Sequence, residues 1–104
     1  MLDQSLFVST AVQEREVELP DGNKHKMFFK ELTSADISRY INALNSQDEE
    51  KQISANAKLI AQSLCEPNGS PAVTVEQAAN LKIGVIGNIL EAIREVNGMG
   101  EKKV

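Results

Sequence analysis

The residues of this chain that could carry out chemistry are few and are scattered. His25 is the single histidine and Cys65 the single cysteine, and the two lie far apart in the sequence. A metal site needs several ligands at suitable spacing, so neither residue belongs to a metal-binding motif. A nucleophilic cysteine needs an activating base or a depressed pKa, and Cys65 instead follows an apolar residue at the end of an expected helix. We therefore expect a surface histidine and a half-buried structural cysteine.

The remaining candidates for chemistry have simpler explanations. The acidic run Asp48–Glu50 is contiguous, whereas cation-binding loops space their oxygen ligands and include a turn glycine. The segment Asn68–Ser70 lacks the glycine spacing and the lysine of a phosphate-binding loop. The sequence also contains no Gly-x-Ser-x-Gly motif, in which a nucleophilic serine is held at a sharp turn. We predict that the chain is not an enzyme and needs no cofactor or metal.

Length, charge and cysteine content narrow the class of protein further. The chain has 104 residues, which suits one domain, and a net charge of −4 with no basic cluster, which disfavours nucleic acid as a partner. A single cysteine allows no disulfide within the chain and suits a reducing cytoplasm. No apolar stretch approaches the roughly 20 residues that span a bilayer, and the N-terminus lacks the positive region of a signal peptide.

The clearest local pattern predicts a β-hairpin. Val17 and Leu19 alternate with charged residues before a Pro-Asp-Gly-Asn turn, and Met27 and Phe29 alternate with other residues after it. Proline presets φ, aspartate bonds its own backbone and glycine accepts positive φ, so these residues favour a tight turn. Because an isolated hairpin is only marginally stable, its four apolar side chains are expected to pack on helices.

Three capping signals predict helices after the hairpin. Thr33 and Asp48 have N-cap chemistry, and Thr74 with Gln77 has the spacing of a capping box. The second helix should end before Pro67, because the residue before a proline leaves helical conformation. The positions expected to be buried are Ile37, Tyr40, Ile41 and Leu44 in the first helix, and Ile53, Ala57, Ile60, Ala61 and Leu64 in the second. Leu59 falls outside this face, so it is expected either to be exposed or to contact another element.

A last helix is expected from near Lys82. Its apolar residues cover about half the circumference, which predicts the central helix of the domain. They are Ile83, Val85, Ile86, Ile89, Leu90, Ile93 and Val96. Gly84 and Gly87 fall on the polar side, where each costs about 1 kcal/mol of helix propensity relative to alanine, and close approach of a partner would be one reason for them. Gly98 should end the helix, so that Met99 can fold back on the last turn.

The order of these elements predicts an α+β fold, in which an N-terminal β-hairpin packs on a small bundle of three to four helices. We expect residues 1–12 to form a flexible arm, residues 13–100 a single domain and residues 101–104 a polar tail. The arm is either a frayed terminus or edge strand, or a segment that becomes ordered on a partner.

Without a catalytic constellation, the function that remains is binding. The hairpin edges could accept another strand, and apolar side chains at the surface could contact a second protein. The candidate contacts are Leu6, Phe7, Val8, Phe28, Leu59 and Met99. The alternative is that these residues are ordinary core or scattered surface positions, because much of any protein surface is apolar.

The order of segments resembles that of the small tail assembly chaperones of long-tailed bacteriophages and prophages. A hairpin with "LPDG" leads to "FKELTSADI", then to "LIAQSLCEPNGSP", "VTVEQAANL" and "IGNILEAIREVNGMG". Three pieces match the usual wording of that family, namely Lys30–Ala35, Ser63–Gly69 and Val96–Met99. The likeness spans about Val17 to Gly100, although Cys65 and Pro67 differ from the usual acidic midpoint.

This resemblance implies a role in tail morphogenesis. Chaperones of this kind bind the tape measure protein and help tail tube subunits assemble around it, without catalysis and without remaining in the finished tail. It implies action in the host bacterial cytoplasm, with self-association possible and with neither nucleic acid nor membrane as a partner. Two alternatives stay open: a structural tail or head-tail component retained in the virion, and a small nucleic-acid-binding regulator.

Overall fold

The alternating segments around the Pro-Asp-Gly-Asn turn pair as the antiparallel strands β1 (Gln13–Glu18) and β2 (Lys24–Phe29). The structure is a computed structural model that describes residues 3, 6–8 and 11–98. In the turn, Gly22 adopts a φ of 89°, and the Asp21 carboxylate accepts a hydrogen bond of 3.0 Å from the backbone N–H of Asn23. Because this bond favours the charged carboxylate, it lowers the pKa of Asp21.

The two faces of the hairpin differ as the alternation predicts. On the inner face, Val17 and Phe29 are buried, with exposed fractions of 2% and 0%. On the outer face, three glutamates of β1 lie opposite residues of β2 that include two lysines. These pairs are Glu14 with Phe28, Glu16 with Lys26, and Glu18 with Lys24. The inner face therefore supplies apolar area to the core, and the outer face carries charges of both signs.

The sheet has a third strand, β3 (Leu64–Cys65), whereas the sequence predicted only two strands. β3 pairs antiparallel with β2, with Phe28 opposite Cys65. Leu64 continues the apolar helical pattern of the preceding segment, so periodicity alone predicts that it is helical. In the structure its φ and ψ are −71° and 126°, so the chain becomes extended here. Pairing with β2 decides this change, and that pairing has no local signal.

Four helices follow the order that the capping signals predict. They are α1 (Ser34–Leu44), α2 (Glu49–Ser63), α3 (Val75–Ala79) and α4 (Ile83–Val96). Thr33 and Thr74 form complete capping boxes with Asp36 and Gln77, and the Asp48 side chain accepts from the backbone of Glu50. Gly98 has a φ of 67° directly after the C-cap of α4, as expected for a glycine that ends a helix.

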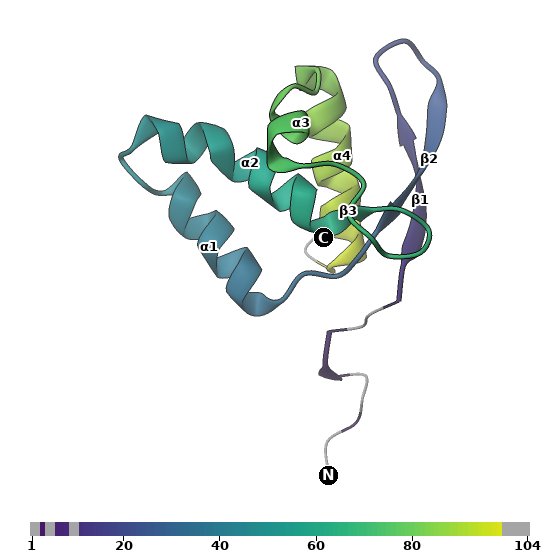
Figure 1. Cartoon of the computed structure of the whole chain (residues 1–104), viewed down its shortest axis with the longest axis horizontal. Coiled ribbons are helices and arrows are strands. Elements are labelled where there is room, and N and C mark those ends of the chain that lie inside the picture. Colours follow the sequence, from purple (N-terminus) through teal and green to yellow (C-terminus); the bar gives the residue numbers. More distant parts are fainter. Residues whose placement is uncertain (1–2, 4–5, 9–10, 99–104) are drawn as a thin grey trace, which may run out of the picture.

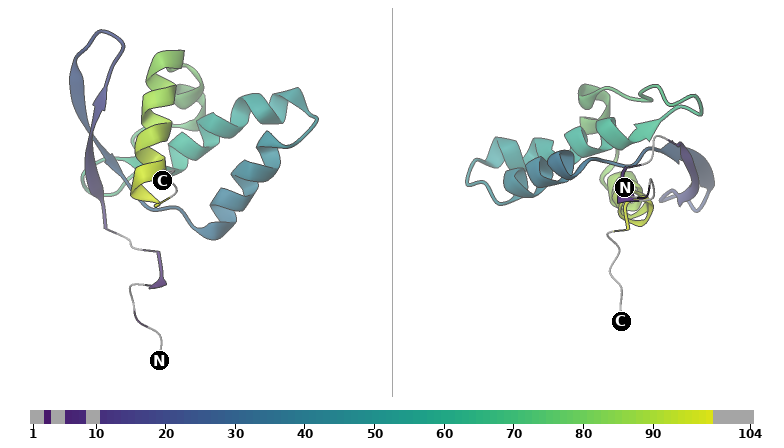
Figure 2. Two further views of the ribbon diagram at one scale, coloured as in Figure 1. Left: turned by 180° about the vertical axis from the view of Figure 1, so that it is seen from behind. Right: turned by 90° about the horizontal axis from the view of Figure 1, so that it is seen from below.

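Helix α4 is central, as its wide apolar arc predicts. It lies between the hairpin and the other helices, and it packs against β1 on one side and α2 on the other (Figure 1). Helices α1 and α2 form a pair that extends away from the sheet, and α3 packs on α2 (Figure 2). The α+β fold, with the hairpin on a helical bundle, is therefore confirmed.

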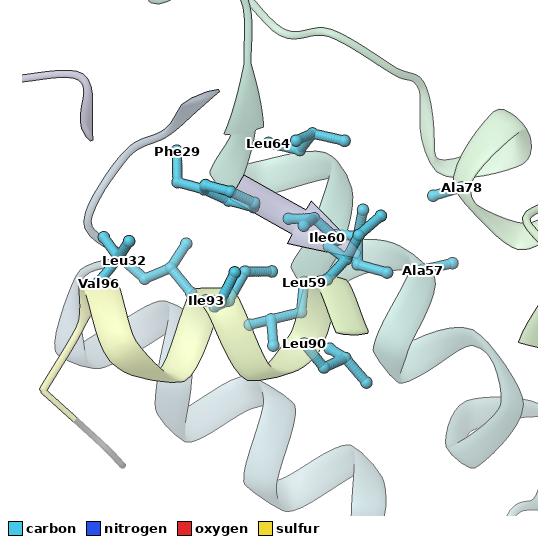
Figure 3. Packing of buried hydrophobic residues seen from close by; sticks show 13 residues of the cluster. Phe29, Leu32, Ala57, Leu59, Ile60, Leu64, Ala78, Leu90, Ile93 and Val96 are labelled. Carbon is cyan, nitrogen blue, oxygen red and sulfur yellow. The ribbon is translucent and has the colours of Figure 1, made fainter. Parts of the chain in front are cut away.

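The core lies where β2, α2 and α4 meet. Phe29, Ile60, Ile89 and Ile93 are its largest fully buried apolar side chains. Leu32, on the connection between β2 and α1, reaches the same cluster beside Val96 (Figure 3). The core is thus built mainly from aliphatic side chains.

Four residues expected in buried positions are exposed instead. Ile41 and Leu44 of α1 have exposed fractions of 46% and 41%, Ile53 of α2 has 72%, and Ile83 of α4 has 89%. Helix α1 packs mainly on α2, so only Ile37 and Tyr40 of its stripe are half-buried. Ile53 lies near the N-terminal end of α2 and Ile83 is the first residue of α4, and neighbouring elements do not cover these positions. Amphipathic spacing gives the direction of the apolar face, but the length that neighbours cover is a tertiary property.

Candidate functional site

A shallow apolar groove lies at the C-terminal end of α4, and we call it the foot groove. Its volume is about 490 Å³, and ten residues line it.

 

Three elements and the N-terminal arm supply the walls of the foot groove. The apolar lining residues are Leu6, Phe7, Val8, Leu32, Ile37 and Val96, and the others are Glu31, Ser34, Asn97 and Gly98.

Hydrogen bonds fix the body side of the foot groove. The Asn97 side chain accepts a bond of 2.7 Å from the backbone N–H of Leu32, and it donates one of 2.8 Å to the carbonyl oxygen of Ile93. This amide therefore ties the connection before α1 to the end of α4. Leu32 and Val96 are held in place beneath the groove, with exposed fractions of 5% and 6%.

The arm supplies the opposite wall and presents its apolar side chains to the surroundings. Leu6, Phe7 and Val8 have exposed fractions of 67%, 57% and 45%. The arm joins the start of β1 on the same side of the molecule as the last turn of α4 (Figure 2). Since all three side chains line the groove and remain largely exposed, they form an accessible apolar surface.

The other candidate contacts do not all join this surface. Phe28 is half-buried on the outer face of β2, opposite Cys65, and it does not line the foot groove. Met99 lies outside the described residues, directly after Gly98 at the rim of the groove.

Leu59 does not lie at the surface, contrary to the expectation of a partner contact there, because only 5% of this residue is exposed. Its side chain lies in the core beside Leu90 and Ile60 (Figure 3). The apolar spacing predicts a single buried face for α2, but α1, α3 and α4 all pack on this helix. Leu59 therefore contacts other elements, which was the second of the two possibilities for this residue.

A second groove, which we call the hairpin groove, lies between the tip of the hairpin and the start of α4. Its volume is about 680 Å³, and Leu19, Met27, Leu81 and Val85 form much of its apolar lining. His25 is exposed, as predicted, and it lines this groove together with Asp21 and Lys82. No sequence pattern indicates this groove, because it depends on where α4 begins relative to the hairpin.

The side of the molecule where β1 meets α4 is acidic. Glu16 and Glu18 of β1 and Glu91 and Glu95 of α4 line one hollow of about 270 Å³. The Asn88 side chain donates a hydrogen bond to the carbonyl oxygen of Glu18, and the Arg15 guanidinium donates one of 2.9 Å to that of Glu14. These two side chains cover part of the free edge of β1, which limits strand addition there.

The structure shows the surroundings of the residues that were considered for chemistry. Cys65 is buried, with an exposed fraction of 3%, so it is more deeply buried than expected, and burial raises the pKa of its thiol. Among the described residues, no group of three or more His, Cys, Asp or Glu side chains is placed to hold a metal ion. Across the same part of the chain, no helix has the length and apolar character needed to cross a membrane.

Comparison with known proteins gives two matches of different kinds. The family model described as phage tail assembly chaperone, TAC, matches residues 1–97. The fold is similar to that in the structure of the bacteriophage HK97 tail assembly chaperone, with a TM-score of 0.57 and 16% sequence identity over 82% of this chain and 85% of that chain. No curated protein sequence matches the chain.

Proposed function

Because the chain belongs to the phage tail assembly chaperone family, we propose that it binds the tape measure and tail tube proteins while the tail is built. It acts without catalysis, in the cytoplasm of the host bacterium, and it leaves before the tail is complete. The family match over residues 1–97 is the observation that carries this proposal.

The foot groove is the surface that we assign to the partner. A holding function requires apolar contacts that form and dissociate, and Leu6, Phe7 and Val8 expose such contacts beside a groove of about 490 Å³. A net charge of −4 keeps the rest of the surface hydrated, so that the apolar contacts remain local. The groove therefore suits apolar side chains of a partner segment.

Co-purification tests the proposed function. The chain is co-expressed with a tagged tape measure protein, and separately with a tagged tail tube protein, from the same gene cluster. We expect this chain to be retained with each tagged protein. Absence of retention with both tagged proteins would overturn the proposal. Mass spectrometry of mature particles tests whether the chain leaves the tail, and stoichiometric amounts of it in those particles would show that it stays.

A matched pair of variants tests the assigned surface. Replacement of Leu6, Phe7 and Val8 together by serine should weaken retention of the chain with its tagged partner about tenfold or more, because three apolar contacts are removed. Ile83→Ser is the control, since Ile83 is 89% exposed and does not line the foot groove. Equal loss in both variants would argue against the foot groove as the binding surface.

A further inference from the structure

Helices α1 and α2 form a layer that is covered only in part. The two helices run antiparallel and are joined by residues 45–48. Helix α4 crosses one side of this layer near the C-terminal end of α2, and α3 lies on the opposite side (Figure 2). On the α4 side, none of the described elements covers the part of the layer next to residues 45–48 (Figure 2).

Helical spacing places two exposed side chains of α1 on this uncovered area. Ile37 lines a small cavity together with Leu90 of α4, so this face of α1 is directed toward the α4 side. Ile41 and Leu44 follow Ile37 by one and two turns on the same face. Because α4 does not extend over them, these two side chains have exposed fractions of 46% and 41%.

Ile53 of α2 extends the same apolar area. It precedes the core residue Ile60 by two turns on the same face of α2, and its exposed fraction is 72%. The bond between the Tyr40 hydroxyl and the Asn56 side chain fixes the register of the two helices, and Leu44 and Ile53 both lie beyond it, toward the connection. We call this surface of three apolar side chains the tip face, which consists of Ile41, Leu44 and Ile53.

The border of the tip face is acidic. Asp48, Glu49 and Glu50 lie at the start of α2 and are exposed, and no ion pair among the described residues engages their carboxylates. Glu49 precedes Ile53 by one turn on the same face of α2. Lys51 is separated from Ile53 by half a turn and so lies on the opposite face. The charge beside the tip face is therefore negative.

We propose that the tip face binds an amphipathic α-helix of another protein, whose apolar stripe is flanked by lysine or arginine. Such a helix would lie beside α4 and would repeat the packing that α4 makes on α2. Its stripe would cover the three exposed side chains, and its basic flank would meet the carboxylates at the start of α2. This inference goes beyond the proposed function, because the tip face is a second surface whose residues do not line the foot groove.

Binding of synthetic peptides to the full chain tests the proposal. Peptides of about 18 residues are long enough to form a helix. The first carries leucine at helical spacing with lysine on both sides of the stripe, the second has glutamate in place of lysine, and the third is a scrambled form of the first. By fluorescence anisotropy, the lysine-flanked peptide should bind about tenfold more tightly than either of the others. Equal binding of the lysine-flanked and scrambled peptides would overturn the proposal.

Variants of the chain locate the binding surface. Ile41→Ser combined with Ile53→Ser should weaken binding of the lysine-flanked peptide about tenfold, because both side chains are exposed apolar contacts. Val75→Ser is the control, since Val75 is 43% exposed and lies on α3, on the other side of the layer. Glu49→Lys combined with Glu50→Lys should reverse the preference between the lysine-flanked and glutamate-flanked peptides. Equal loss in the double serine variant and the control would overturn the proposal.

Sedimentation of the chain without peptide tests a second copy as the occupant. We expect the wild type and the double serine variant to have the same mass. A larger species that the serine substitutions convert to monomer would overturn the proposal, because a copy of this chain would then cover the tip face. None of these measurements uses the tape measure or tail tube protein, so their failure leaves the proposed function intact. Peptide binding by a chain that retains neither tagged protein would contradict the proposed function alone.

Discussion

Gly84 and Gly87 of α4 are both glycines, but their surroundings differ. A Cβ atom added at Gly84 would lie 2.9 Å from Cγ of Pro20, whereas nothing lies within 4 Å of the corresponding position at Gly87. Gly84 thus lets the hairpin tip approach α4 closely, which gives a physical reason for one glycine on the polar side of the helix. The structure offers no comparable reason for Gly87.

Substitution by alanine is expected to change the stability of the protein differently at the two glycines. Gly87→Ala should stabilise the protein by up to about 1 kcal/mol, through helix propensity alone. Gly84→Ala should gain less or lose stability, because the rigid ring of Pro20 and the hairpin tip must move. Urea denaturation of both variants measures the difference, and equal stabilisation would contradict the close contact.

Amphipathic spacing predicts that Ile53 of α2 is buried, and it leaves Leu59 outside the buried face. In the structure Leu59 is buried and Ile53 is exposed. Leu59→Ala should destabilise the protein by about 2–5 kcal/mol, since it removes a buried side chain. Ile53→Ala should change stability by less than about 0.5 kcal/mol, because the side chain is largely exposed. Thermal unfolding of the pair checks the assignment, which a larger effect at Ile53 would refute.

Because the Cys65 thiol is buried, we expect the protein to lose stability in alkaline solution. Burial raises its pKa above the ordinary value of 9.0, so the fold favours the protonated thiol. The stability that the protonated thiol contributes is fully present below the pKa of Cys65 in the unfolded chain. It is lost as pH rises through the pKa of Cys65 in the folded protein. Between about pH 8 and pH 10, the wild type should lose more unfolding free energy than Cys65→Ala. Equal losses in chemical denaturation would contradict a raised pKa.

At the scale of elements, α1 is the least integrated helix. It contains no buried residue and packs mainly on α2, with the Tyr40 hydroxyl donating a bond of 2.8 Å to the Asn56 side chain. Helix α4, in contrast, contains five buried residues and contacts both β1 and α2. Opening α1 therefore exposes little apolar surface, whereas opening α4 disrupts the core.

Hydrogen exchange should separate these two helices. Backbone amides of α1 should exchange faster than those of α4, because local opening is governed by the buried contacts that each element makes. Thr33→Ala, which removes the capping box of α1, should accelerate exchange in α1 more than in α4. Equal protection of both helices in the wild type would contradict this hierarchy.

At the scale of the whole molecule, stability and partner binding are expected to depend on different parts of the chain. The core joins β2, α2 and α4, while Leu6, Phe7 and Val8 of the arm lie at the surface with large exposed fractions. Leu6, Phe7 and Val8 line the foot groove, and none of the described arm residues is buried. The sequence of the arm can thus serve binding with little effect on folding.

Removal of residues 1–10 tests this separation. The shortened chain should unfold at nearly the same temperature as the full chain, because the segment supplies no described core residue. The same chain should retain the tape measure protein less well, since one wall of the foot groove is absent. A large fall in the unfolding temperature would show that the arm belongs to the folded domain.

Local sequence determined the elements that have local causes. The turn at Gly22, the caps at Thr33, Asp48 and Thr74, and the stop at Gly98 are all where their chemistry predicts. These signals act over a few residues through hydrogen bonds and allowed backbone angles, so neighbouring residues suffice to reveal them. The order of hairpin and helices predicted the α+β fold class, and the family resemblance added the chaperone family; both are confirmed.

Tertiary structure decided which apolar residues are covered and which form grooves. β3 exists because β2 offers an edge to Leu64 and Cys65, and Leu59 is buried because α4 packs beside it. The foot groove joins the arm, the connection before α1 and the end of α4, which are separated in sequence by most of the chain. Such placements depend on contacts between distant segments, and the pattern within any one segment does not contain them.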